Sequence, residues 1–333
     1  MPAPGRHTVL VADFLDESSV ESPVLDDIAT LVLCRATREE ELACHLPGAD
    51  AIMLFHDIPH LGEASFARAP RCKCVVRAGV GYNNVDRAAA SRHGVVVCNV
   101  PDYGTEEVAD HAIMFLLALV RRLMPCHQAI RSGTWHYQTA IGTPRLRGKT
   151  LGLIGCGRIG TATALRAKPL GLDVVFYDPH LRHGMDKALG IRRVHSLDEL
   201  LEQSHFVSVH CYLDATTHHL INKARLARMR EGAILINTAR GPCVDESALL
   251  DALDSGHLAA AGLDVVEREP LDDPRLRDHP RILFTPHSAF YSVEGFIELR
   301  TKTAEEVRRI LLGEPPRNPV NLGTPPHPRL ELA

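Results

Sequence analysis

Short apolar runs alternate with amphipathic segments along nearly the whole chain. In the first hundred residues, the apolar runs at 8–12, 51–55, 74–76 and 95–98 predict strands. Helical patterns lie between some of these runs, in TREEELACHL and LGEASFARA. Strands that alternate with helices are typical of a parallel sheet with crossover helices, so we expect an α/β fold.

A second series of the same kind begins near residue 150, after the breaker-rich stretch IGTPRLRGK. Strands are predicted at TLGLI, VVFYD, FVSVH, AILIN, AAGLD and RILFT, and helices from Gly157, in LDELLEQ, near 222–229 and from Asp245. Two such series in one chain indicate two α/β domains.

Residues 105–130 form the most apolar helical pattern, and it is apolar on nearly all sides. A helix of that kind has to be buried against another domain or another subunit. We expect Pro125 to end or kink it and Trp135 to pack near its end.

Length and composition fit a globular protein of two domains. The chain has 333 residues, of which 45% are hydrophobic, and its net charge of −4 gives no electrostatic reason to expect nucleic acid or an anionic membrane as partner. No apolar stretch approaches the roughly 20 residues that cross a bilayer, and no signal peptide is recognised at the start. The nine scattered cysteines indicate reduced thiols, which predicts a cytoplasmic protein without disulfides.

The strongest local motif is TLGLIGCGRIG, in which Gly155, Gly157 and Gly160 give G-x-G-x-x-G directly after a strand. Such glycines permit a tight turn, a close approach of backbone to pyrophosphate and close packing of the next helix on the strand. Asp178 ends the following strand, 18 residues past the last glycine, where a carboxylate can accept the ribose hydroxyls of NAD and would repel the 2′-phosphate of NADP. The motif therefore predicts a dinucleotide site with a preference for NAD.

Charged residues follow several strands of the second series. Arg240 comes just after AILIN, Asp264, Glu267 and Glu269 follow the strand that ends in AAGL, and His287 follows RILFT. Arginine can bind a carboxylate through two parallel hydrogen bonds. A carboxylate next to a histidine favours the protonated imidazole, which is the form that acts as a general acid. Residues of these types could bind and protonate a 2-oxo acid, although each could also be an ordinary surface or capping residue.

Ordered blocks along nearly the full length carry a resemblance. They are VRAGVGYNNVD, LGLIGCGRIG, FYDP, HHLINKARLARMREGAILINTARGPCVDE, GLDVVEREP and TPHSAFYS. With these blocks the chain resembles the D-isomer-specific 2-hydroxyacid dehydrogenases, and within them the C-terminal-binding-protein branch. The resemblance implies a flavodoxin-like substrate domain (1–101 plus 293–333) into which a Rossmann-type NAD domain (102–292) is inserted. It also implies an active site in a cleft and a homodimer formed through the NAD domain.

The same resemblance implies roles for individual residues. Arg240 would be the catalytic arginine, His287 the acid/base and Glu269 its partner, with Glu267 a solvated neighbour. In reduction His287 would protonate the carbonyl oxygen. Besides Asp264 at the nicotinamide carboxamide, the implied cofactor-binding positions are Val80, Gly155, Gly157, Arg158, Ile159, Gly160, Asp178, His210, Cys211, Thr217, Thr238, Ala239 and His287. The implied substrate-binding positions are Arg77, Val80, Gly81, Arg240, His287 and Phe290.

Three departures from the family pattern stand out. Asn83 replaces the usual aspartate in GYNNVD, a turn position. Tyr212 replaces the proline of the usual H-x-P-L loop, where it could cover the nicotinamide or face solvent. Phe290 stands where the branch often has tryptophan, which leaves the substrate open. His218 and His219 lack supporting ligands at metal spacing, so no metal is expected.

Two functions remain open at this level. The first is an NAD-dependent dehydrogenase of 2-hydroxy or 2-oxo acids, including a specialised reductase of a phosphonate- or phosphate-bearing oxo acid, or one for a branched or aromatic oxo acid held against Phe290 and Tyr291. The second is an NADH-sensing dimeric binding protein, like the corepressors of this branch.

Overall fold

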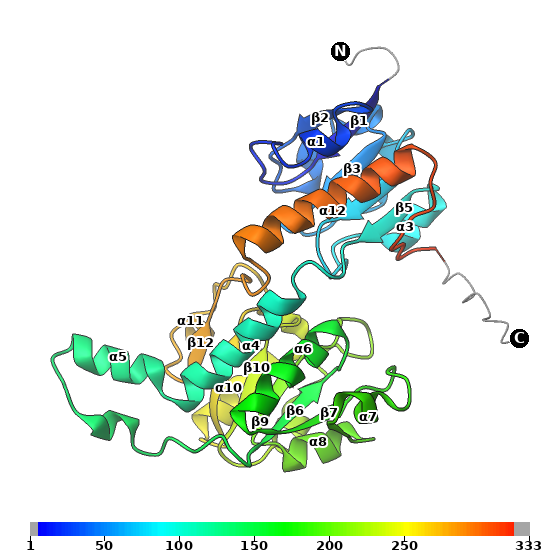
Figure 1. Ribbon diagram of the computed structural model, residues 1–333. Coiled ribbons are helices and arrows are strands. Elements are labelled where there is room, and N and C mark those ends of the chain that lie inside the picture. The colour runs from blue at the N-terminus through cyan, green and yellow to red at the C-terminus, as the bar shows by residue number, and fades with distance from the viewer. Residues whose placement is uncertain (1–5, 323–333) are drawn as a thin grey trace, which may run out of the picture. The chain divides into compact units, whose positions relative to one another are not determined.

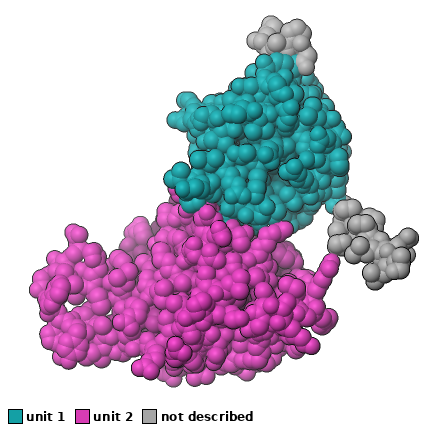
Figure 2. Space-filling view, viewed as in Figure 1, with its two compact units in different colours: residues 1–104, 292–333 teal, residues 105–291 magenta. Residues whose placement is uncertain are grey.

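The computed structural model describes residues 6–322, which form two compact units (Figure 2). One unit contains residues 6–104 and 292–322, and the other contains residues 105–291. The domain bounds expected from the sequence also take in 1–5 and 323–333, which lie outside the described residues.

The first unit is built on a five-stranded parallel sheet with strand order β2-β1-β3-β4-β5. This is the flavodoxin-like order. The chain adds β2 on one side of β1 and then crosses to add β3, β4 and β5 on the other side. The strands are β1 (His7–Val11), β2 (Ala29–Leu33), β3 (Ala51–Leu54), β4 (Cys74–Arg77) and β5 (Val96–Asn99). The helices are α1 (Ser22–Leu25), α2 (Glu63–Arg68), α3 (Arg87–Arg92) and α12 (Val293–Leu311), with 3-10 turns η1 (Glu39–Leu42) and η2 (Leu46–Gly48).

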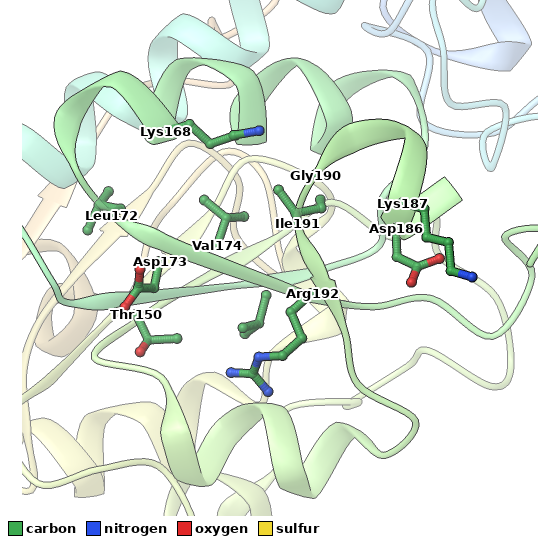
Figure 3. Close-up of a pocket in the computed structure, with 11 residues that line it drawn as sticks. Thr150, Lys168, Leu172, Asp173, Val174, Asp186, Lys187, Gly190, Ile191 and Arg192 are labelled. Carbon is green, nitrogen blue, oxygen red and sulfur yellow. The ribbon is translucent and has the colours of Figure 1, made fainter. Parts of the chain in front are cut away.

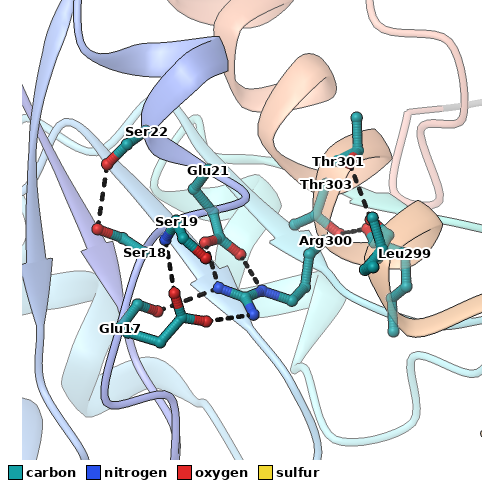
Figure 4. Close-up of polar contacts among 10 residues, drawn as sticks. Glu17, Ser18, Ser19, Glu21, Ser22, Leu299, Arg300, Thr301 and Thr303 are labelled. Atoms are coloured by element: carbon teal, nitrogen blue, oxygen red, sulfur yellow. Dashed lines mark hydrogen bonds and ion pairs between the residues drawn. The ribbon is translucent and has the colours of Figure 1, made fainter. Parts of the chain in front are cut away.

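Helix α12 joins this unit from the far end of the chain, and a buried charge network attaches it there (Figure 4). The guanidinium of Arg300 donates to both carboxylate oxygens of Glu21 at 2.7 Å and to Glu17 at 2.6 Å. Arg300 and Glu21 are almost fully buried, so each charge depends on the other for compensation. The hydrogen bond from Ser19, followed by that from Arg300, lowers the pKa of Glu17 to about 2.

The second unit is built on a seven-stranded parallel sheet with order β12-β11-β10-β9-β6-β7-β8 (Figure 1). The chain adds β7 and β8 on one side of β6 and then β9 to β12 on the other side. The point between β6 and β9 where it changes sides is where ligands bind in doubly wound sheets. The strands are β6 (Thr150–Ile154), β7 (Asp173–Tyr177), β8 (Arg192–Arg193), β9 (Phe206–Val209), β10 (Ala233–Asn237), β11 (Leu258–Leu263) and β12 (Ile282–Phe284). The helices are α4 (Thr105–Val120), α5 (Leu123–Arg131), α6 (Arg158–Ala167), α7 (Met185–Leu189), α8 (Leu197–Gln203), α9 (Lys223–Leu226), α10 (Glu246–Asp254) and α11 (Pro274–Arg277), with 3-10 turns η3 (Tyr137–Ala140), η4 (Lys168–Leu170) and η5 (Gly241–Cys243).

The apolar segment predicted as one helix over 105–130 is two helices. The break falls at Arg122, whose φ of 53° is left-handed, and not at Pro125, which lies in the first turn of α5 where a missing N–H is tolerated. Helix α4 packs on the sheet with Phe115 and Leu116 fully buried. Helix α5 contains no buried residue and extends away from the sheet (Figure 1), and Trp135 beyond it is 85% exposed instead of packed.

Three other expectations differ from the structure. Strands β2 and β8 were not predicted from the sequence, and the helix predicted in TREEELACHL is replaced by two 3-10 turns, η1 and η2, the second of which contains Pro47. In the described part of the chain, no single helix is long and apolar enough to span a membrane. Helices α4 and α5 meet that criterion only as a pair, by length and composition, with a 59° bend between them.

Candidate functional site

The predicted site residues of the second unit lie along one edge of its sheet. All seven strands are parallel, so their carboxyl ends meet at the same edge. We call the ends of β6, β7 and β9 the glycine-loop half of this edge, and the ends of β10, β11 and β12 the histidine half. The two halves are built in different ways.

The glycine loop follows β6, and its backbone requires glycine for two separate reasons. Gly155 has φ of +91°, and a Cβ there would lie 2.9 Å from the carbonyl of His210. A Cβ on Gly160 would lie 2.3 Å from the Gly155 oxygen, so α6 could not start so close to the loop. A Cβ on Gly157 would meet nothing within 4 Å, so the backbone at that position is open to a ligand.

Helix α6 begins at Arg158, with Ile159 next, so the N–H groups of its first turn lie directly after Gly157. These N–H groups have no partner within the helix and favour a phosphate. Asp178, directly after β7, accepts from the Cys156 N–H at 2.9 Å and from those of His180 and Leu181. A carboxylate can accept about four hydrogen bonds, and three N–H groups donate to Asp178 here. One acceptor position is therefore available for a hydroxyl of a ligand.

The segment after β9 contains three of the predicted cofactor-binding residues. His210 is half-buried with its Nδ1 fully enclosed, and this burial lowers its pKa from 6.5 to about 4, so the ring is neutral at pH 7. The Cys211 thiol donates to that of Cys243 across 4.0 Å, an interaction that raises the pKa of Cys211. The Thr217 hydroxyl donates to the Tyr212 carbonyl at 2.7 Å, which fixes the loop.

Among the described residues, two buried polar atoms of this edge have no hydrogen-bond partner: Nδ1 of His210 and Oγ1 of Thr238. Thr238 and Ala239 follow β10, next to the end of β9. Buried polar atoms usually have partners, so these two fit a ligand that supplies hydrogen-bonding groups. The open Gly157 and these two atoms together fit a dinucleotide.

The histidine half consists of charged side chains. His287, three residues past β12, shares a hydrogen bond of 2.7 Å between its Nδ1 and Oε2 of Glu269. Burial alone would raise the pKa of Glu269, but the hydrogen bond and charge of His287, with a smaller contribution from Arg240, hold it below its ordinary value. Arg240, three residues past β10, donates to the Ala239 carbonyl at 2.6 Å. The pair predicted from the sequence is therefore formed.

The loop that carries His287 is held by Asp264, which directly follows β11 and is 3% exposed. Its Oδ1 accepts from the Thr285 hydroxyl at 2.6 Å and the Ser288 N–H at 2.9 Å, and its Oδ2 accepts from the Ala289 N–H at 3.0 Å. The Asp264 carbonyl accepts from the N–H of His287, whose φ of 51° is left-handed. This backbone conformation is costly for a residue with a side chain and persists only where surrounding contacts enforce it.

Sequence reasoning missed a residue beneath this loop. His111 of α4 places Nε2 2.8 Å from the Thr285 hydroxyl, and burial lowers its pKa despite the nearby charge of Asp264. A histidine beside the apolar run of this helix was the available signal. Glu267, expected to be solvated, is instead bonded to His219 at 3.0 Å and to the Glu246 N–H at 2.9 Å.

Phe290 lies with its ring centroid 6.4 Å from that of His287, edge to face, and makes a similar contact with Tyr291. Tyr212 makes a contact that neither expectation foresaw. Its hydroxyl lies 3.2 Å from Nε2 of His180, the second residue beyond Asp178.

The predicted substrate residues of the first unit lie at the end of β4 and in the turn after it. Arg77 is 8% exposed and donates from Nη1 to the Ala78 carbonyl, while Val80 and Gly81 are more exposed. The Asn99 side chain donates to the Val80 carbonyl at 2.7 Å and so fixes this turn. Asp13, after β1, is a buried acid that sequence reasoning missed, and burial raises its pKa to about 6.

One cavity of about 600 Å³ lies at the other edge of the seven-stranded sheet (Figure 3). Thr150, Asp173 and Arg192, which begin β6, β7 and β8, line it. It is therefore separate from the glycine loop. Among the described residues no cluster of three His, Cys, Asp or Glu is placed to hold a metal ion.

Comparison with known proteins identifies relatives. Residues 113–289 match the family model described as D-isomer specific 2-hydroxyacid dehydrogenase, NAD binding domain. C-terminal-binding protein 1 of Caenorhabditis elegans is 36% identical over 328 residues, covering 95% of this chain and 45% of that protein. D-3-phosphoglycerate dehydrogenase of Mycobacterium bovis is 38% identical over 315 residues, covering 95% and 59%. The chain thus spans about half the length of these curated relatives.

Among solved structures, D-lactate dehydrogenase from Aquifex aeolicus, complexed with NAD and lactic acid, is 30% identical to this chain. The two superpose with a TM-score of 0.84, over 92% of this chain and 96% of the other. The similarity includes both units, and it extends the family match beyond the NAD-binding portion.

Proposed function

Because this chain belongs to the D-isomer specific 2-hydroxyacid dehydrogenase family, we propose that it transfers a hydride between NAD(H) and a 2-hydroxy or 2-oxo acid. The observation that carries the proposal is the 2.7 Å hydrogen bond between His287 and Glu269, on the same sheet edge as the glycine loop. An acid/base pair beside a dinucleotide site is what reduction of a carbonyl requires.

In the direction of reduction, bound NADH supplies the hydride to the carbonyl carbon. Arg240 binds the substrate carboxylate and polarises the carbonyl. His287 donates a proton to the carbonyl oxygen, and in the reverse direction it takes the proton of the hydroxyl. Glu269, held as a carboxylate, accepts a hydrogen bond at Nδ1 of His287 and so directs the other ring nitrogen, Nε2, to the substrate.

The substrate side chain is proposed to lie against Phe290. Its edge-to-face contact with His287 places this aromatic ring next to the proton donor. An anionic oxo acid, such as one bearing a phosphonate, would instead use the charge of Arg77 in addition to that of Arg240. A panel of pyruvate, phenylpyruvate, methylthio-oxobutyrate, hydroxypyruvate and phosphonopyruvate separates these classes.

The test is NADH oxidation by the purified protein with each member of this panel. We expect turnover with at least one oxo acid and preference for a bulky apolar side chain. Protein that binds NADH in a fluorescence titration but oxidises it with no oxo acid would contradict the proposed reaction.

We also propose a homodimer formed through the NAD-binding unit. The segment from α5 to η3 exposes large apolar side chains, among them Ile130 at 50%, Trp135 at 85% and Ile141 at 60%. A cavity of about 720 Å³ lies between this segment and the sheet, lined by Met124, Leu283 and others. Such exposure is typical of an interface. Sedimentation should give a dimer, and Trp135→Asp with Ile130→Asp should shift it toward the monomer.

A second function, NADH-dependent binding of a protein partner, rests on the similarity to C-terminal-binding protein 1. It would be favoured if NADH promoted capture of partner peptides while His287→Ala left that capture unchanged. Both functions require the dinucleotide site, so NADH binding by itself does not distinguish a dehydrogenase from a sensor. Turnover of an oxo acid does.

A further inference from the structure

Two aromatic side chains come together over the glycine-loop half. The hydroxyl of Tyr212 lies 3.2 Å from Nε2 of His180, and the ring centroids are 6.0 Å apart. Tyr212 is 56% exposed, so this contact does not result from burial in the core.

The sheet order determines what lies beneath this contact. Tyr212 follows β9 and His180 follows β7, and these two strands flank β6. The loop that leaves β6 contains Gly155 and Gly157, so a contact from the end of β9 to the end of β7 bridges across it. A dinucleotide bound at this edge would run across the same strand ends.

Both sides of the bridge are held by their own loops. The Asp214 carboxylate accepts from the N–H groups of Thr216 and Thr217, and Thr217 bonds to the Tyr212 carbonyl. On the other side, the His180 N–H donates to Asp178, and Arg193 donates to the Asp178 carbonyl. The two rings are thus positioned before a ligand binds, which lowers the loss of side-chain entropy on binding.

We propose that Tyr212 and His180 form a clasp over the adenosine half of the bound dinucleotide. The position of Asp178 decides the half, because this carboxylate stands where the adenosine ribose binds and lies two residues before His180. The Tyr212 ring supplies an apolar face for the adenine, and its hydroxyl, bonded to His180, closes the bridge. The inference rests on dinucleotide binding and not on the reaction proposed above.

The test measures binding to the full-length protein by fluorescence and calorimetry, with NADH, ADP-ribose and nicotinamide mononucleotide as probes. Tyr212→Ala should weaken NADH and ADP-ribose about tenfold, in the range of one lost stacking contact, and leave nicotinamide mononucleotide unchanged. Tyr212→Phe and His180→Ala, which keep the stacking ring but remove the hydrogen bond, should each cause a smaller loss of the same two ligands.

A matched control is His183→Ala, an exposed histidine in the same loop as His180. It should bind all three probes as the wild type does. The clasp is contradicted if Tyr212→Ala binds ADP-ribose with wild-type affinity, if nicotinamide mononucleotide weakens equally, or if the wild type binds no dinucleotide. Failure of oxo acid turnover, with the binding pattern intact, would contradict only the proposed reaction.

Discussion

The glycine-loop half and the histidine half share one sheet edge, but the first offers mainly backbone groups to a ligand and the second mainly side chains. In the glycine-loop half, Gly155 allows the chain to turn, and Gly157 leaves the backbone open to a ligand. In the second, side chains are set by other side chains, as Glu269 sets His287. A site for a common cofactor can be made from backbone, whereas proton transfer needs a titratable group in a fixed orientation.

This difference predicts that substitutions in the two halves separate binding from chemistry. His287→Ala should lower kcat for oxo acid reduction by about 10²- to 10⁴-fold, the usual contribution of a general acid, while the Kd for NADH stays within about twofold. Steady-state kinetics and a fluorescence titration on one preparation measure both. His195→Ala, at an exposed position, is the matched control. An equal loss of binding and turnover would remove the distinction between the halves.

Two glycine substitutions sharpen the other side of the comparison. Gly155→Ala forces a side chain into left-handed backbone and against His210, so it should lower the free energy of unfolding by about 2 kcal/mol or more. Gly157→Ala meets no protein atom and only puts a poorer N-cap residue before α6, so the free energy of unfolding should fall by no more than about 1 kcal/mol while NADH binding weakens by about tenfold. Chemical denaturation and calorimetry give the two numbers. Full NADH affinity in Gly157→Ala would show that the dinucleotide does not approach this backbone.

Asp264 tests whether the histidine half depends on its supporting loop. Asp264→Asn replaces one acceptor oxygen by a donor group that faces an N–H or hydroxyl, which should cost about 1–3 kcal/mol of stability. We expect kcat to fall further than stability alone explains, since His287 is released from its left-handed conformation. A kcat equal to that of the wild type at a temperature where the variant is folded would contradict this support.

The smallest expected effect is a dependence of stability on pH through His210. Its folded pKa of about 4 lies below the unfolded value of 6.5, so the unfolded chain binds the proton first. Stability from this group is therefore present above pH 6.5 and is lost as the pH falls toward 4, by about 1 kcal/mol at pH 5.5. Urea denaturation of the wild type and His210→Gln at pH 7 and 5.5 should show a smaller loss in the variant. Equal losses would mean that His210 takes up a proton without unfolding.

The two halves also differ in how far the sequence predicted them. The glycine loop and Asp178 were readable because their spacing is local and follows from strand, turn and helix. The pairing of His287 with Glu269 crosses 18 positions, and it came from the family resemblance. His111 was missed because nothing local links it to Thr285, 174 positions away.

In the fold, the alternation of strands and helices predicted both sheets but missed one edge strand of each, β2 and the two-residue β8. The break at Arg122 was also missed, because Pro125 was the visible breaker and a left-handed arginine leaves no sequence signal. Tyr212 was noticed as a departure, but its contact with His180 depends on the order of β9, β6 and β7, which the sequence does not state.

The most direct test of the proposed reaction follows the hydride itself. The wild-type protein is incubated with NADH that carries deuterium at both C4 positions and with the best oxo acid of the panel, and the 2-hydroxy acid is analysed by mass and by chiral chromatography. We predict one deuterium on C2 of the product and the D configuration. A product without deuterium, a product of L configuration, or no product from a protein that binds NADH would contradict the account.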